Sequence, residues 1–137
     1  ILRQPRKLDT LLRNVVDMRE KMHSHFDAGV NETGFDLKHD RGGIVDIEFM
    51  VQYQVLAHAE THPELATYTD NIRQLDGLSE SGCISTVDAD ALKRAYVRYR
   101  TLNHEAILAG LKGRVEFAKV ENERQLVKSL WAQWMSS

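Results

Sequence analysis

A pair of glycines and the cations before it are the residues of this sequence whose types and spacing could bind an anion. Lys38, His39 and Arg41 come just before Gly42 and Gly43, in the stretch FDLKHDRGGIVDIEF. Glycines let a backbone approach a ligand closely or adopt a positive φ. The start of a following helix presents free N–H groups and the positive end of its dipole, which favours an anion. Such a helix start could hold a phosphate group, with Lys38, His39 and Arg41 adding positive charge on the approach.

Two carboxylates follow the glycines, and they allow two interpretations. Asp46 falls near the third position of the predicted helix, where a carboxylate stabilises the helix dipole by roughly 0.3–1 kcal/mol. In that interpretation the stretch is an ordinary helix start with no ligand. In the other, the two carboxylates and the cations before the glycines belong to a phosphate site. The spacing leaves both open and does not name a substrate.

The helix that begins at the glycines is predicted to reach about His62 and to be apolar on nearly every side. A helix of that kind is buried. Its polar residues do not gather on one solvent face; they are Asp46, Glu48, Gln52 and Gln54. A buried polar group without a partner costs about 1–3 kcal/mol. Each of these side chains must therefore find a bond inside the protein or face a wet cleft.

Apolar residues at three- and four-residue spacing predict helices along most of the chain. The expected elements are helices over about residues 8–26, 71–79, 86–111 and 120–135 and a short extended stretch over residues 35–38. Ser85 is the expected N-cap of the third of these helices, with Asp88 near its third position. The apolar stripe of the first helix is Leu8, Leu11, Leu12, Val15, Met18, Met22 and Phe26. Together with the helix after the glycines, this is an all-α bundle of four longer helices and one short one.

Composition bounds the function classes. A chain of 137 residues is a single domain at most. The net charge of −2, with acids and bases interleaved, argues against a nucleic-acid partner. No apolar run approaches the roughly 20 residues that a membrane span needs. Cys83 is the one cysteine, which excludes a disulfide framework and fits a reducing cytoplasm.

Other candidate sites have less support. His58 and His62 stand one helical turn apart and could bind a metal, but no third ligand is evident; the HSH stretch at residues 23–25 has equally little support. Cys83 lies in a turn without a recognisable catalytic partner. Four aromatic residues at helical spacing are expected in the core rather than on a stacking surface: Tyr96, Tyr99, Trp131 and Trp134.

The stretch FDLKHDRGGIVDIEFMVQYQVL closely resembles the signature of the bacterial glutamine synthetase adenylyltransferases, bifunctional enzymes that add and remove AMP. In that family two nucleotidyltransferase domains are each followed by a helical domain with a Lys…Gly-Gly-Ile…(Asp/Glu)-Ile-Glu-Phe motif, and this form looks like the C-terminal copy. The segments MREKM, DNIRQLDGL and LVKSLWAQWM also resemble that region, so the similarity covers essentially the whole chain. Arg41 departs from an expected proline, and Gln54 from an apolar residue.

The resemblance implies a function for a larger enzyme. Such an enzyme is cytoplasmic and uses ATP and magnesium to transfer AMP to a tyrosine of glutamine synthetase, under the control of the PII signal protein and glutamine. The chain begins with isoleucine, and we expect it to be the C-terminal helical domain, with the nucleotidyltransferase domain upstream. Lys38, Arg41 and the N–H groups after Gly42 and Gly43 would then face the triphosphate of ATP. Asp46 and Glu48 would order those cations or support the metal site of the neighbouring domain.

The catalytic motif of such an enzyme is missing from this chain. Nucleotidyl transfer of this type needs a Gly-Ser turn and a metal-holding Asp-x-Asp on a strand, where two magnesium ions stabilise the attacking and leaving oxygens. The chain has no Gly-Ser pair, and its one Asp-x-Asp, Asp88-Ala89-Asp90, falls at the start of a predicted helix. We expect the fragment to hold no metal and to be inactive by itself.

Three roles are open for the chain. The domain could complete the nucleotide site and the joint with its neighbouring domain. It could instead be a regulatory module that docks glutamine synthetase or PII, with no part in the active site. The third possibility is a free-standing helical protein with no enzyme attached.

Overall fold

The computed structural model describes residues 4–27, 34–67, 69–110 and 113–135, and their side chains except those of residues 4–8, 24–27 and 66. These residues form an all-α bundle, as predicted, and one small sheet that was not predicted. The α-helices are α1 (Gln4–Asp27), α2 (Ile44–His58), α3 (Asn71–Glu80), α4 (Thr86–Leu108) and α5 (Glu121–Trp134). The 3₁₀ helices are η1 (Pro63–Thr67) and η2 (Phe117–Val120), and the strands are β1 (Phe35–Asp36) and β2 (Arg114–Val115).

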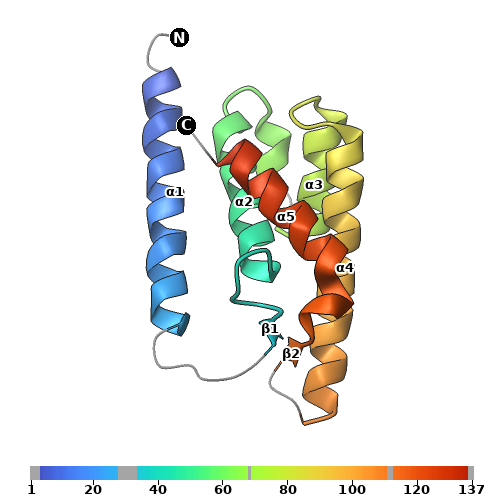
Figure 1. The fold of residues 1–137 in the computed structure, drawn as a ribbon. Coiled ribbons are helices and arrows are strands. Elements are labelled where there is room, and N and C mark those ends of the chain that lie inside the picture. Colours follow the sequence, from blue (N-terminus) through green and yellow to red (C-terminus); the bar gives the residue numbers. More distant parts are fainter. Residues whose placement is uncertain (1–3, 28–33, 68, 111–112, 136–137) are drawn as a thin grey trace.

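Helix α2 lies at the centre of the bundle and contacts α1, α3, α4 and α5. Figure 1 shows α1 along one side of it and α5 running diagonally across α2 and α4. The small sheet lies at the end of the bundle where α2 begins, and α1 starts at the opposite end (Figure 1). The N-terminus of α2 is therefore placed by three neighbours: the sheet, the end of α1 and the start of α5.

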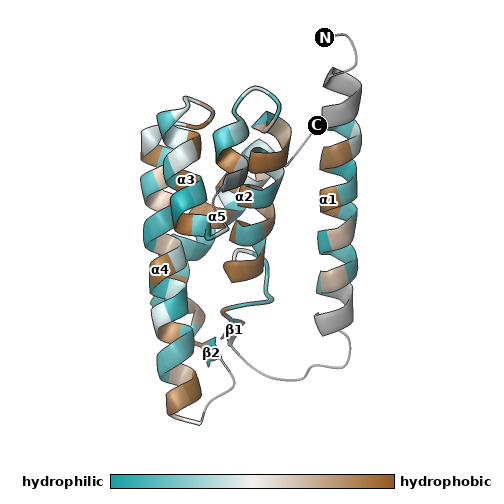
Figure 2. Cartoon of the chain, turned by 180° about the vertical axis from the view of Figure 1, so that it is seen from behind, coloured by the Kyte–Doolittle hydropathy of each residue, from teal (hydrophilic) through white to brown (hydrophobic). Residues whose placement is uncertain are grey.

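The predicted core positions of α4 are all buried, because α4 packs against α2, α3 and α5. They are Leu92, Ala95, Tyr96, Tyr99, Leu102 and Ala106. Trp131 and Trp134 of α5 are half-buried and pack against the core, as predicted. Figure 2 shows hydrophobic residues at the last turn of α4, where Ile107 and Leu108 are 59% and 75% exposed.

The predicted stripe of α1 is partly wrong. Leu12 and Val15 are buried, but Met18 is 60% exposed and the buried residue of the next turn is Arg19. The side chains of Leu8 and Phe26 lie outside the described ones. In this turn of α1, Arg19 therefore faces the interior in place of the neighbouring Met18.

Three helix ends and one strand differ from the prediction. Helix α1 begins at Gln4 rather than near Leu8. Helix α2 ends at His58 rather than near His62, because a turn precedes Pro63 and a residue before proline disfavours the helical conformation. Helix α4 ends at Leu108, followed by Gly110 at a φ of 78°. Strand β2 was not predicted; it pairs antiparallel with β1, with Phe35 opposite Val115.

Candidate functional site

The loop between β1 and α2 folds back on the start of the helix. Three N–H groups there donate to carbonyls of the loop itself: Gly43 to Asp40 (3.0 Å), Ile44 to Leu37 (2.8 Å) and Val45 to Lys38 (3.0 Å). These are N–H groups that the sequence analysis assigned to a phosphate. Since they are engaged by the chain, any contribution of this loop to an anion falls to its side chains.

The two glycines of the loop are needed for close packing. Gly42 has a φ of 88°, a conformation that side-chain-bearing residues rarely adopt. A Cβ on Gly42 would lie 3.0 Å from Cγ of Arg124 in α5, and one on Gly43 would lie 2.6 Å from the carbonyl oxygen of Leu37. The predicted positive φ and close approach are therefore present, and the group approached is the protein's own chain.

Asp46 joins three parts of the molecule. Its carboxylate is 4% exposed; Oδ2 accepts a hydrogen bond from the Gly42 N–H at 2.6 Å, and Oδ1 forms an ion pair with Nε of Arg19. Arg19 is 1% exposed, and its Nη2 donates to the carbonyl of His39 at 2.7 Å. We call the Arg19–Asp46 pair and its bonds to the loop the charge lock. The cation that Asp46 orders is thus one that the sequence analysis did not single out.

Arg41 turns toward α1. Its guanidinium donates two hydrogen bonds to the carboxylate of Glu20, at 2.9 and 2.8 Å, and both side chains are about half exposed. The hydrogen bond from Arg41 is the main reason that the pKa of Glu20 is lowered. Of the predicted cations of the loop, Arg41 is therefore committed to a carboxylate of the same chain.

Lys38 and Glu48 are brought together at the surface. Both line a pocket of about 360 Å³ between α2 and α4, which we call the α2–α4 pocket. Both also line a second pocket of about 640 Å³ between α2 and α3, the α2–α3 pocket. Lys38 is exposed and makes no ion pair among the described residues. These two residues are the part of the predicted set that a ligand could reach.

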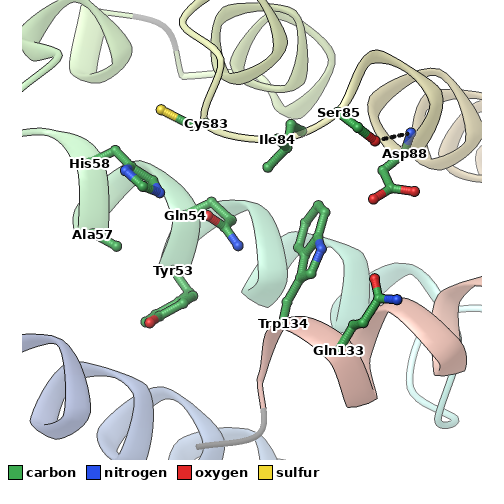
Figure 3. A pocket seen from close by; sticks show the side chains of 10 residues that line it. All are labelled: Tyr53, Gln54, Ala57, His58, Cys83, Ile84, Ser85, Asp88, Gln133 and Trp134. Atoms are coloured by element: carbon green, nitrogen blue, oxygen red, sulfur yellow. Dashed lines mark hydrogen bonds between the residues drawn. The ribbon is translucent and has the colours of Figure 1, made fainter.

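The sequence analysis required each polar residue of α2 to find a bond inside the protein or to face a cleft. Gln52 and Gln54 both line pockets. Gln52 is exposed and lines the α2–α3 pocket. Gln54 is 9% exposed and faces a different pocket, of about 450 Å³, near the C-terminal end of α2. Figure 3 shows Gln54 and His58 of α2 in this pocket, opposite Ser85 and beside Trp134 of α5. We call it the Trp134 pocket.

The Trp134 pocket contains two of the weaker candidates from the sequence. Burial lowers the pKa of His58, with a further contribution from His62, and burial raises the pKa of the Cys83 thiol. His62 lies 3.4 Å from a carboxylate oxygen of Glu64. Over the described residues, no three His, Cys, Asp or Glu side chains lie close enough together to hold a metal ion. Residues 24 and 25 of the HSH stretch lie outside the described side chains.

The predicted start of α4 is confirmed. Ser85 is the N-cap, and its Oγ accepts a hydrogen bond from the N–H of Asp88 at 3.0 Å. Asp88 and Asp90 lie in the first turns of this helix, and Asp90 is within 3.4 Å of Lys93. Their Asp-x-Asp spacing therefore occurs on a helix and not on a strand.

Comparison with known proteins identifies the family. The model of the GlnD PII-uridylyltransferase family matches residues 11–114, which include the charge lock, the loop and all of α4. The chain belongs to this family. No helix in the described part of this GlnD-family chain combines the length and apolar character needed to cross a membrane.

The most similar relatives found carry another name. The bifunctional glutamine synthetase adenylyltransferase/adenylyl-removing enzyme of Burkholderia pseudomallei is 48% identical over 136 residues, which are 97% of this chain and 14% of that protein. The enzymes of the same name from Pseudomonas syringae and Pasteurella multocida are each 42% identical, over 97% and 96% of this chain. The resemblance seen in the residues is thus confirmed. The chain spans only 13–15% of the length of these relatives.

Proposed function

We propose that the chain is the helical domain of a bifunctional glutamine synthetase adenylyltransferase/adenylyl-removing enzyme and that it supports the nucleotide site of an adjoining nucleotidyltransferase domain. The family description names uridylyl transfer to PII, whereas the relatives named above are adenylyltransferases. Identity of 41–48% over nearly the whole chain favours the adenylyl enzyme. The reaction would transfer AMP from ATP to glutamine synthetase, with PII as a regulatory partner.

One observation carries this proposal: Lys38 is exposed, and makes no ion pair with the described residues, on a loop that the charge lock holds in place. A lysine ammonium is a compact charge well suited to a phosphate oxygen. Positioning a charge in advance avoids reorganisation when the reacting group arrives, which is a large part of how enzymes stabilise transition states. The charge lock fixes the loop backbone from which the Lys38 side chain extends.

The residues here fit a nucleotide phosphate better than a complete metal site. Magnesium prefers several oxygen ligands, from carboxylates, water and substrate phosphates. In the α2–α4 and α2–α3 pockets, Glu48 is the one carboxylate among the described residues. Glu48 could thus supply one oxygen toward magnesium-bound ATP, while the remaining protein ligands and the chemistry would come from the adjoining domain. On this proposal the chain alone transfers no AMP.

The length of α1 sets a geometric condition on the proposal. The loop between β1 and α2, which contains Lys38, lies at the opposite end of the bundle from the start of α1 (Figure 1). The 24 residues of α1 span about 36 Å. A domain that precedes Gln4 in the chain must therefore extend along α1 to reach the loop.

The test uses the full-length enzyme that contains this chain. Lys38→Ala should lower kcat/KM for adenylylation of glutamine synthetase by about tenfold or more, which corresponds to ~1.4 kcal/mol of lost transition-state stabilisation. The melting temperature should not change, because Lys38 is exposed. Lys21→Ala is the matched control, since Lys21 is an exposed lysine on α1 that lines neither pocket. Equal turnover of the Lys38 and Lys21 variants would refute the role of Lys38.

A second candidate function is docking of a protein partner without a role at the nucleotide. It is favoured by apolar residues around the α2–α3 pocket: Met22 and Phe49 line it, and Leu56 is 50% exposed there. The partner would be glutamine synthetase or PII. Binding of either protein to the chain, weakened by Leu56→Ser and unaffected by Lys38→Ala, would support docking over the nucleotide role.

A further inference from the structure

Helix α4 brings an arginine and a histidine to the pocket that contains Lys38. Arg100 and His104 stand one helical turn apart on α4 and both line the α2–α4 pocket. The sequence analysis did not single out either residue, since they lie more than 60 positions from Lys38 in the chain. The packing of α4 against α2 is what places them on the same surface.

Most of the other described lysines and arginines have carboxylate partners, whereas Lys38 and Arg100 have none among the described residues. Arg19, Arg41, Arg73, Lys93, Arg98, Arg114 and Arg124 each have an acidic partner within 4 Å. Neither Lys38 nor Arg100 forms an ion pair within the described part of the chain. The guanidinium of Arg100 instead lies over the ring of Tyr96, 5.6 Å from its centre.

The remaining lining favours an anion. Glu48 is the one carboxylate in this pocket among the described residues, so Lys38 and Arg100 leave an excess of positive charge. Ile44 and Ile107 form apolar walls, which reduce solvent screening and strengthen the attraction of cations for an anion. The guanidinium fork of Arg100 can bind two phosphate oxygens at once, whereas Lys38 supplies a point charge.

We propose that the α2–α4 pocket binds a polyphosphate anion, with Lys38 and Arg100 as its two principal cations and His104 beside them. The anion would be the β- and γ-phosphates of a nucleoside triphosphate or the pyrophosphate that nucleotidyl transfer releases. This choice of anion rests on the proposed function. The excess of unpaired cations in the pocket does not depend on it.

The direct test is titration of the chain with sodium pyrophosphate at constant ionic strength, with the heat of binding measured by isothermal titration calorimetry. The chain should bind saturably, and Arg100→Ala should weaken binding by about tenfold. Arg94→Ala is the matched control: Arg94 is also exposed on α4 and forms no ion pair among the described residues, but it does not line the pocket. Circular dichroism checks that both variants keep their helices.

Two results would overturn the proposal. One is binding of equal strength in the wild type, the Arg100→Ala variant and the Arg94→Ala variant. The other is the absence of saturable heat beyond that produced by sodium chloride at matched ionic strength, which would mean charge screening only.

The full-length enzyme distinguishes the two sources of the anion. A raised KM for ATP in Arg100→Ala supports a nucleotide phosphate, and weaker inhibition by pyrophosphate with an unchanged KM supports the product. Failure of the proposed function is separable: if Lys38→Ala adenylylates normally while pyrophosphate binding still depends on Arg100, the anion site stands and the catalytic role does not. If Lys38→Ala is impaired in adenylylation while Arg100→Ala binds pyrophosphate as tightly as the wild type, the catalytic role of Lys38 stands and the anion site does not.

Discussion

At its N-terminal end α2 is tied to α1 and to the preceding loop by the buried Asp46, whereas at its C-terminal end Gln54 and His58 face the Trp134 pocket (Figure 3). The N-terminal end presents at the surface cations that form no ion pair with the described residues, Lys38 and Arg100. Among the described residues, no lysine or arginine lines the Trp134 pocket. An anionic ligand is therefore attracted to one end of α2 only. That same end is held by the ion pair and hydrogen bonds of the charge lock.

The buried ion pair gives the largest expected effect. Asp46→Ala should lower the free energy of unfolding by about 3–5 kcal/mol, because Arg19 is left as an uncompensated buried charge. Asp88 is the matched control: it occupies the same third helical position in α4 but is not buried. Asp88→Ala should cost only the dipole term of roughly 0.3–1 kcal/mol. The measurement is urea unfolding of both variants.

A double variant sharpens this result. Replacing Arg19 by Met together with Asp46→Leu should cost far less than the sum of the two single changes, since no buried charge remains unpaired. Similar small losses for Asp46→Ala and Asp88→Ala would favour the dipole interpretation of Asp46 and remove the contrast between the two ends of α2.

The glycines of the loop give the next largest effect. Gly42 and Gly110 both have positive φ, 88° and 78°, so alanine at either position should cost about 1–2 kcal/mol for the backbone alone. Gly42→Ala should cost roughly 1–3 kcal/mol more, because its Cβ would crowd Arg124, whereas nothing lies within 4 Å of a Cβ on Gly110. The measurement is again the free energy of unfolding. Equal losses would show that Gly42 is needed for its φ and not for packing.

Periodicity predicted the helices well because each long helix repeats its signal several times. In α4 the core positions recur at three- and four-residue spacing from Leu92 to Ala106, and every one is buried. Ser85 was predictable from local chemistry, since an N-cap needs only its own helix start. Strand β2, with two residues, has no period to detect, and its partner β1 lies far away in the sequence.

The site was less predictable because its parts come from distant segments. The sequence placed Asp46 correctly at the start of α2 but could not give its partner, Arg19, which is 27 positions away. One signal was present: Arg19 falls on the face of α1 shared by Leu12 and Val15, and a charge there implies a buried partner. Arg100 gave no such signal, because an exposed arginine is ordinary until a neighbouring helix is known.

The N-cap of α4 tests the wall of the Trp134 pocket. Ser85→Ala removes the acceptor for the Asp88 N–H and should lower the free energy of unfolding by about 1 kcal/mol. Ser85→Asn should retain stability to within a few tenths of a kcal/mol, because asparagine caps as well as serine. Urea unfolding measures both. If alanine is tolerated as well as asparagine, the capping bond adds nothing to stability at this end of the bundle.

The smallest expected effect is a pH dependence at the same end. Burial, and then the charge of His62, lowers the pKa of His58 from its ordinary value of 6.5. The other titratable side chains that line the Trp134 pocket, among the described residues, are those of Asp88, Tyr53 and Cys83. Asp88 is the one carboxylate among them. The unfolded chain therefore binds a proton at a higher pH than the folded chain does. Stability contributed by neutral His58 is complete above pH 6.5 and is lost as the pH falls below it, toward the folded pKa.

The slope of the free energy of unfolding against pH reports how many protons the chain takes up when it unfolds. Between pH 7.5 and 5.5, His58→Gln should reduce this uptake by a fraction of a proton. The pKa of His39, at the other end of α2, is also lowered by burial, but His39 is unchanged in this variant. The difference between the slopes of the wild type and the variant therefore excludes the contribution of His39. Thermal unfolding of both proteins across this range measures it. Identical slopes would mean that protonation of His58 is as favourable in the folded chain as in water, and that the Trp134 pocket imposes no cost on positive charge.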